Sequence, residues 1–155
     1  MSLSNKEREH IIAVAESWYG TPFYPHACLK GCGVDCAQFL AGVYREAGYW
    51  CGDGIVLPAE YSIQIGQHSS DSSYIDIIQM YMREIPEVEV RSGDVVIYWV
   101  GLAFSHAAII KSWPDHIIHA LERGGVTAGH GMDSNFRNLQ KKFFSLRDVH
   151  CKGAV

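Results

Sequence analysis

Hydrophobic residues recur with two different periods along the chain, and the change of period divides it into two parts. Up to residue 82, apolar positions have the spacing of one face of a helix. Glycine and proline interrupt this spacing over residues 20–34, where we expect a loop. The helices predicted from the spacing are residues 5–19, a helix that begins near Cys36, and a short helix over residues 75–82.

Beyond residue 90, runs of β-branched and aromatic residues replace the helical spacing. Such runs predict strands where turn residues bound them. Because the predicted helices precede the predicted strands instead of alternating with them, we expect an α+β fold and not a doubly wound sheet. The predicted strands are residues 94–100, 105–110, 116–120 and 142–146, whereas residues 49–73 are expected to form a loop with a short helical turn.

The composition is that of one globular domain. The chain has 155 residues, of which 48% are hydrophobic and 19% are charged, and no repeat, low-complexity tract or linker divides it. We therefore treat residues 1–155 as a single domain. The net charge of −4 argues against a nucleic-acid partner, because little bulk positive charge is available to neutralise phosphates, although residues 134–155 are locally basic.

Two features of the sequence bear on the compartment. The N-terminal residues are polar and resemble no signal peptide, and no apolar run reaches the ~20 residues that cross a bilayer. We therefore expect synthesis in the cytoplasm without a signal peptide and no membrane partner. The five cysteines are an odd number, which argues against a disulfide framework.

One cysteine and two histidines are the candidates for chemistry. Cys36 lies where the glycine-rich loop turns into a helix, so the helix dipole and free backbone N–H groups are expected to lower its pKa and to stabilise an oxyanion. A cysteine nucleophile also needs a base, and the base needs an orienting partner. His106 begins one predicted strand and His119 ends the next, and adjacent antiparallel strands can bring two such residues together.

Less specific interpretations compete with this triad. A cysteine at a helix start is often a small buried hydrophobe, and a histidine on a strand is often a core residue. Three cysteines with a spacing of four, Cys28, Cys32 and Cys36, lie near His26, but the glycines between them break the helix that would align them. The two close ligand pairs of a structural zinc site are also missing. We therefore expect no metal and no cofactor.

Four ordered segments carry a resemblance to a known family: GTPFYPHACLKGCGVDCAQFLAGVYREAG, RSGDVVIYWV, FSHAAII and IIHA. They resemble the NlpC-type (NlpC/p-sixty) family of cell-wall cysteine peptidases. In that family a Gly-Thr-Pro-Tyr loop, an Asp-Cys-Ser-Gly-Phe helix start, a Gly-Asp strand entry, a Ser-His strand and an Ile-His-Ala strand end follow in this order. The match spans about residues 12–125. The longer loop, the Asp-Cys-Ala-Gln sequence and the closing Phe-Phe-Ser resemble the phage-tail branch.

The resemblance implies a role for each residue that matches a motif. Cys36 corresponds to the nucleophile, His106 to the base and His119 to the orienting residue. Asp35 and Ser105, which precede the nucleophile and the base, are expected in the substrate pocket.

Two further pocket residues are predicted in the loop before the nucleophile. The family's Pro-Tyr is Pro22-Phe23 here, so Tyr24 is the candidate to supply the hydroxyl group, although neighbouring side chains of an extended segment point to opposite sides. His26 is expected to line the same cleft. Ala37 and Gln38 stand where the family has Ser-Gly, which changes the pocket wall or the helix packing.

The resemblance also implies a fold and an activity. The fold would be a pared-down papain-like core of helices packed on an antiparallel sheet. The activity would be metal-independent hydrolysis of the γ-D-glutamyl to diaminopimelate (or Lys) bond in peptidoglycan stem peptides. The enzyme would belong to a phage or prophage tail, with tail proteins as partners, and would act at the bacterial cell wall. Two alternatives stay open: a tail structural or assembly domain without catalysis, and a thiol amidase or acyltransferase that acts on another substrate.

Overall fold

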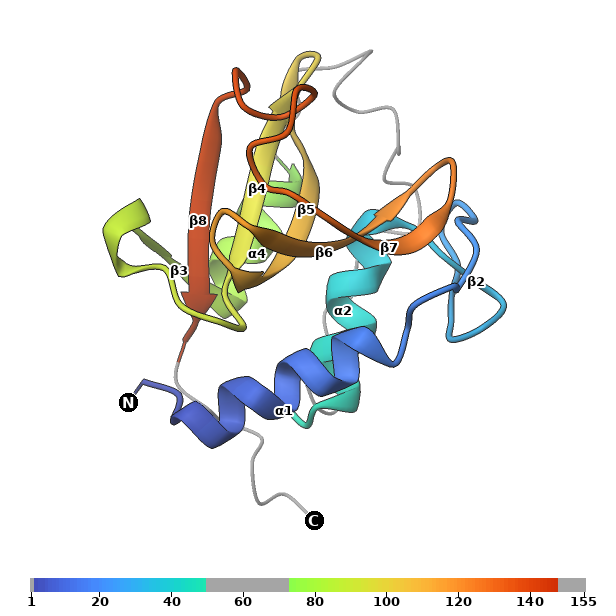
Figure 1. The fold of residues 1–155 in the computed structure, drawn as a ribbon, viewed down its shortest axis with the longest axis horizontal. Helices are drawn as coiled ribbons and strands as arrows, with labels where there is room; N and C mark the ends of the chain where they lie inside the picture. Colours follow the sequence, from blue (N-terminus) through green and yellow to red (C-terminus); the bar gives the residue numbers. More distant parts are fainter. Residues whose placement is uncertain (1, 50–72, 148–155) are drawn as a thin grey trace.

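The computed structural model describes residues 2–49 and 73–147 as helices packed on an antiparallel sheet (Figure 1). All three predicted helices are present. The first ends earlier than predicted, because residues 17–20 turn and bring the Gly20 N–H to the Val126 carbonyl oxygen. The expectation for residues 49–73 falls almost entirely outside the described residues. The helices are α1 (Asn5–Glu16), α2 (Cys36–Glu46), α4 (Ser73–Tyr81) and the 3₁₀ helix η1 (Glu87–Glu89).

The main sheet has six antiparallel strands in the order β3-β8-β4-β5-β6-β7. The four predicted strands are confirmed as β4, β5, β6 and β8. The two edge strands were not predicted: β3 follows a helix directly, and β7 begins and ends with glycine. The strands are β3 (Met82–Ile85), β4 (Val95–Val100), β5 (Ala103–Ser112), β6 (His116–Leu121), β7 (Gly125–Gly129) and β8 (Lys141–Leu146).

The segment 20–34, predicted as a loop, contains a small two-stranded sheet of β1 (Cys28–Leu29) and β2 (Gly33–Val34). Its first residues connect this sheet to the edge of the main one. The Gly20 N–H donates to the Val126 carbonyl oxygen (3.0 Å), and the Val34 N–H donates to the Pro22 carbonyl oxygen (3.0 Å). The loop that precedes α2 is therefore held at both ends.

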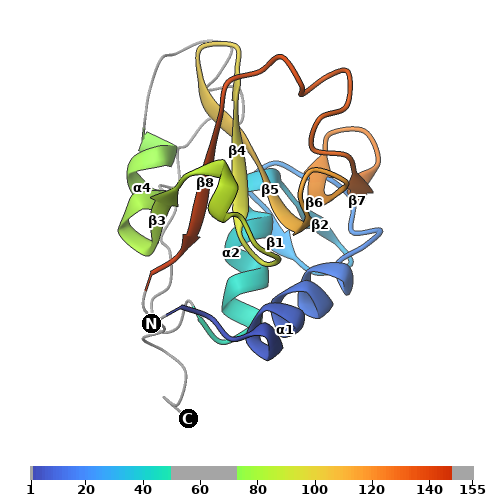
Figure 2. The ribbon, with the colours of Figure 1, turned by 60° about the vertical axis from the view of Figure 1, so that its left-hand side comes forward.

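The core lies between α2 and the sheet. Helix α2 packs against β5 and β6, and α1 crosses below it and touches β5 (Figure 1). Helix α4 and strand β3 lie at the opposite side of the sheet from β7 (Figure 2). No helix within residues 2–49 and 73–147 is long and apolar enough to span a bilayer. The largest fully buried side chains of this core include Tyr44, Phe39 and Phe144, whereas the fully buried Tyr98 belongs to a second apolar cluster.

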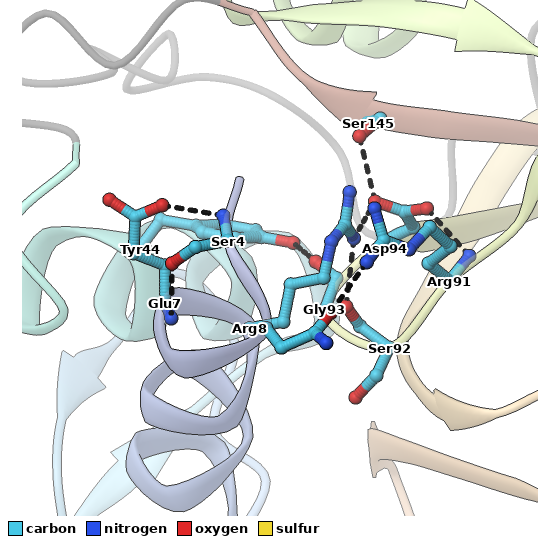
Figure 3. Close-up of polar contacts among 10 residues, drawn as sticks. Ser4, Glu7, Arg8, Tyr44, Arg91, Ser92, Gly93, Asp94 and Ser145 are labelled. Carbon is cyan, nitrogen blue, oxygen red and sulfur yellow. Dashed lines mark hydrogen bonds and ion pairs between the residues drawn. The ribbon is translucent and has the colours of Figure 1, made fainter. Parts of the chain in front are cut away.

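A buried ion pair joins α1 to the turn that enters β4 (Figure 3). Arg8 Nη1 lies 2.9 Å from Asp94 Oδ1, and the two residues are only 5% and 1% exposed. Arg8 also donates to the Ser92 carbonyl oxygen (2.8 Å), and the Ser145 hydroxyl donates to Asp94 Oδ1 (2.8 Å). The Arg91 N–H donates to the other Asp94 oxygen (2.8 Å). Asp94 is thus a structural residue that ties α1, β4 and β8 together.

Candidate active site

The two predicted histidines meet between neighbouring strands. His106 lies on β5 and His119 on β6, and these strands pair antiparallel. Nε2 of His106 lies 3.0 Å from Nδ1 of His119, a hydrogen-bond distance. His119 is 2% exposed, whereas His106 is partly buried. The strand pairing therefore brings the two imidazoles together as the sequence predicted.

Cys36 is the first residue of α2, at the end of the helix that faces β5 and β6. Its thiol donates a long hydrogen bond to the carbonyl oxygen of Ser105, with an Sγ···O distance of 3.6 Å. Ser105 directly precedes His106, and its hydroxyl makes a second long contact with the Val100 carbonyl oxygen (3.4 Å). The structure thus places the Cys36 thiol against the strand residue that precedes His106, and among the described residues the hydrogen-bond acceptor of the thiol is this backbone oxygen and not an imidazole.

The electrostatics of the thiol differ from the expectation. Burial raises the pKa of Cys36 to about 12, and the neighbouring Asp35 carboxylate adds to the increase. Backbone hydrogen bonds from Ala107, Ala37 and Cys36 itself lower the pKa, but they do not outweigh the loss of water. The predicted lowering by the helix N-terminus is therefore wrong for the free protein, and the resting group is a neutral thiol.

The histidines are neutral as well. Burial, together with the nearby His119, lowers the pKa of His106 to about 3. Burial lowers the pKa of His119 to about 4, although Asp133 opposes this shift. Near pH 7 both rings are uncharged, so each has one nitrogen that donates and one that accepts. The pair can accept a proton from a neighbour only if the reaction supplies the driving force.

Asp35 has a different position from the one expected for a pocket residue. It is fully buried and forms the N-cap of α2, where one carboxylate oxygen accepts the Gln38 N–H (2.8 Å). The other oxygen accepts the His26 N–H (2.7 Å). An Asp at the N-cap satisfies backbone donors that the helix leaves unpaired. Its carboxylate therefore fixes the loop and the helix start, and does not line an open pocket.

The two loop residues predicted for the pocket present their side chains to solvent. Tyr24 is 65% exposed, whereas Phe23 packs against the hydrophobic core. His26 is exposed and has a positive φ of 61°, a conformation that places its N–H on Asp35. Its contribution to the site is through its backbone. Phe23 and Tyr24 therefore point to opposite sides of the segment, as expected for neighbouring residues of an extended chain, and Tyr24 does not take the place of the family's tyrosine.

Sequence reasoning missed two residues that contact the histidine pair. Phe136, in the turn between β7 and β8, has ring centroids 5.5 Å from His106 and 5.7 Å from His119. Gly129 at the end of β7 leaves room for His119, because a Cβ there would lie 2.9 Å from His119 Nε2. A single phenylalanine in a polar turn and a glycine that ends a strand have no sequence signal for this role.

Several other cysteines and histidines among the described residues have no assigned role at this site. Cys28 and Cys32 are free thiols, and the exposed His10 and His130 lie on the surface as expected. In the described part of the chain, no three His, Cys, Asp or Glu side chains are grouped so that they could hold a metal ion. Four residues discussed from the sequence fall outside the described residues: Cys51, Cys151, His68 and His150.

Comparison with known proteins bears on the fold. No family model matches the sequence, and no curated protein matches it. Several solved structures, however, match the fold of this chain. The NlpC/p60 domain of the peptidoglycan hydrolase SagA superposes with a TM-score of 0.62 at 18% identity, covering 90% of this chain and 98% of that one. The chain has the NlpC/p60 fold.

Two other structures with this fold differ in informative ways. An NLP/P60 family protein from Staphylococcus aureus, described as similar to lipoprotein, matches with a TM-score of 0.65 at 17% identity; the match covers 96% of this chain but 44% of that protein. RipD from Mycobacterium tuberculosis, described as a non-catalytic NlpC/p60 domain protein adapted to peptidoglycan binding, matches with a TM-score of 0.56 at 15% identity over 93% of this chain and 98% of that one. The predicted papain-like α+β core is therefore confirmed, and the fold includes both hydrolases and a non-catalytic protein.

Proposed function

We propose that this protein is an NlpC/p60-type cysteine peptidase that hydrolyses peptidoglycan stem peptides. The observation that carries the proposal is the position of the Cys36 thiol beside the backbone that leads into His106, whose imidazole is paired with His119. The Cys36 sulfur contacts the Ser105 backbone at the start of α2, and His106, the next residue, is hydrogen-bonded to His119. A nucleophile, a base and an orienting partner are the parts that thiol acyl transfer requires. The SagA domain, described as a peptidoglycan hydrolase, supports the choice of substrate.

The proposed reaction proceeds through a thioester. The Cys36 sulfur attacks the amide carbonyl while its proton moves to His106, and backbone N–H groups at the start of α2 face the oxyanion that forms. His106 then gives this proton to the leaving amine as the carbon–nitrogen bond breaks. A water molecule, deprotonated by His106, hydrolyses the thioester and restores the thiol.

The histidine geometry defines the protonation state that this reaction needs. Because Nε2 of His106 faces His119, Nδ1 is the nitrogen that accepts the thiol proton. His106 must then carry its own proton on Nε2 and donate it to Nδ1 of His119. His119 consequently carries its proton on Nε2, the atom next to Gly129. His119 therefore sets the tautomer of the base.

The bond and the biological setting belong to the proposal too. We propose the γ-D-glutamyl to diaminopimelate (or Lys) bond as the scissile bond, and a phage or prophage tail as the carrier of an enzyme made in the cytoplasm and acting at the cell wall. The resemblance to the NlpC-type family supports the bond, and the His26-containing loop, the Asp35–Gln38 motif and the closing Phe-Phe-Ser support the tail setting. Mass spectrometry of purified tail particles would test the setting, since a tail enzyme must be present in them.

A non-catalytic peptidoglycan-binding domain is the second candidate. Two observations favour it: the raised pKa of Cys36 and the likeness to RipD, described as non-catalytic. Such a domain would bind muropeptides but release no fragments. Because the Cys36 thiol contacts the residue next to His106 and His106 is paired with His119, catalysis is the better-supported function.

Digestion of purified muropeptides would decide between the two candidates. Wild-type protein, Cys36→Ser and the matched control Cys32→Ser, which changes an exposed thiol, are incubated with diaminopimelate-type and Lys-type muropeptides. Mass spectrometry should find stem-peptide fragments with the wild type and the control but none with Cys36→Ser. Binding without fragments would instead identify the non-catalytic domain, and equal release by all three proteins would remove Cys36 from the reaction.

A further inference from the structure

Two aromatic rings, Phe136 and Tyr98, lie nearly parallel to the ring of the proposed base. Phe136 and His106 have an interplanar angle of 2° with their centroids 5.5 Å apart. Phe136 also stacks on Tyr98 of β4, at 4.6 Å and 26°, and Tyr98 lies 6.2 Å from His106. Phe136 meets the His119 ring edge-on at 5.7 Å and 60°. One side chain thus touches both members of the histidine pair.

The turn that carries Phe136 is anchored to the sheet. The buried Tyr98 hydroxyl donates to the Gly131 carbonyl oxygen (2.7 Å), and the Gly131 N–H donates to the Pro114 carbonyl oxygen (2.8 Å). A Cβ at Gly131 would collide with the Trp113 ring, so the turn lies directly against that ring. The Phe136 N–H donates to the Asp133 carbonyl oxygen (3.0 Å). These contacts restrict where the Phe136 ring can lie.

We propose that Phe136 is a positioning residue, which fixes the ring plane of His106 and keeps water away from the hydrogen bond between His106 and His119. The inference rests on the proposed function for its catalytic consequence. Stacked rings have a preferred offset arrangement, so the Phe136 face restricts rotation of the imidazole about its χ2 angle. With the plane fixed, Nε2 stays on His119 and Nδ1 stays available for the Cys36 proton.

Loss of the ring should also change the proton affinity of the base. The titratable groups near the imidazole are His119 from β6, which faces it, and Tyr98 from β4, whose ring centroid lies 6.2 Å away, while Asp133 from the turn acts on His119 and Tyr98. None of them is removed by a substitution at Phe136. Water that enters in place of the ring solvates the imidazolium, so the pKa of His106 should rise from about 3 toward its ordinary value.

The test compares wild-type protein with Phe136→Leu, Phe136→Tyr and the control Leu139→Ala. Leu139 packs on the same apolar cluster as Phe136, in the same turn. Phe136→Leu removes the flat ring and part of its cover, so that water can reach the histidine pair, whereas Phe136→Tyr restores the ring. One readout is kcat and KM on the muropeptide that the wild type cleaves. The other is the pKa of each imidazole, from an NMR titration of the protein without substrate.

We expect Phe136→Leu to lower kcat by about 10- to 100-fold with little change in KM, because misplacement of a reacting group acts on the chemical step. It should also raise the pKa of His106, whereas Phe136→Tyr and Leu139→Ala should resemble the wild type in both readouts. Phe136→Met replaces Phe136→Leu if that variant does not fold. An unchanged His106 pKa in the folded variant, or an equal effect of Leu139→Ala, would overturn the inference. A wild type without activity would refute the proposed function alone, since the titration still tests the position of the ring.

Discussion

Two buried polar clusters within the described residues differ in whether their members carry charge. At the first, Arg8 and Asp94 are buried and in contact at 2.9 Å, so each side chain meets an opposite charge (Figure 3). At the second, His106 and His119 are in contact at 3.0 Å, and burial lowers the pKa of both. One cluster joins two ions and the other joins two neutral rings.

The difference shows that burial has a structural consequence at the ion pair and a chemical one at the histidine pair. An opposite charge and several hydrogen bonds compensate the desolvation of Arg8 and Asp94, so the pair can connect helix α1 with the sheet. Nothing comparable compensates a proton on the histidine pair, where Asp133 only partly opposes the shift of His119. The pair therefore stays neutral and can accept a proton during a reaction.

The largest effect is expected from replacing the proposed base. His106→Gln should reduce kcat/KM by about 10³- to 10⁴-fold, at the upper range for general acid–base catalysis, because the neutral Cys36 thiol then has no proton acceptor. The melting temperature should stay near that of the wild type. Steady-state assays on muropeptides and circular dichroism would measure the two quantities. A large loss of stability would mean that the histidine pair is a structural cluster like the first.

Breaking the ion pair should lower stability and leave activity nearly unchanged, the reverse of the result expected at His106. Arg8→Met leaves Asp94 buried without its counterion and should lower the free energy of unfolding by about 3–5 kcal/mol, with little change in the kcat of folded protein. Adding Asp94→Asn should recover part of the loss, since the amide carries no charge. Urea denaturation of both single variants and the double variant gives the coupling energy. Simple additivity of the two substitutions would show that the charges do not interact.

Mild acid should lower the stability of the folded protein through the histidine pair. Because the folded pKa values of about 3 and about 4 lie below the ordinary value of 6.5, the unfolded chain binds more protons between these limits. Stability should therefore fall as the pH falls from 6.5 toward 4, by about 2 kcal/mol per imidazole at pH 5. Melting curves of wild type and His119→Gln at pH 7 and pH 5 would measure this. Equal losses in both proteins would contradict the assigned shift of His119.

Two glycine substitutions should give the smallest effects, one on activity and the other on stability. Gly129→Ala places a Cβ 2.9 Å from His119 Nε2 and should lower kcat by about tenfold through misplacement of the ring. Gly42→Ala on α2 crowds the Trp18 ring at 2.7 Å. It should lower stability by about 1–2 kcal/mol, since overpacking outweighs the better helix propensity of alanine. Activity and unfolding measured on both variants check this; a Gly129→Ala protein with normal kcat would exclude the tight fit at His119.

The sequence by itself determined most of the local structure and the candidate chemistry. Its helical spacing predicted α1, α2 and α4, and its β-branched runs predicted β4, β5, β6 and β8. The order of these elements also predicted that the strands of His106 and His119 would be neighbours. These inferences succeed because the period of apolar residues and the order of elements are local properties of the chain.

The tertiary structure alone decided how the side chains are surrounded. The edge strands β3 and β7 are short and depend on partners elsewhere in the chain, such as the pairing of β3 with β8. The pKa of Cys36 is raised because burial exceeds the effect of the helix start, and burial is set by packing from distant segments. Phe136 reaches His106 from thirty positions further along the chain. A sequence pattern carries no record of such contacts, because they arise from how the elements pack and not from the spacing of residues along them.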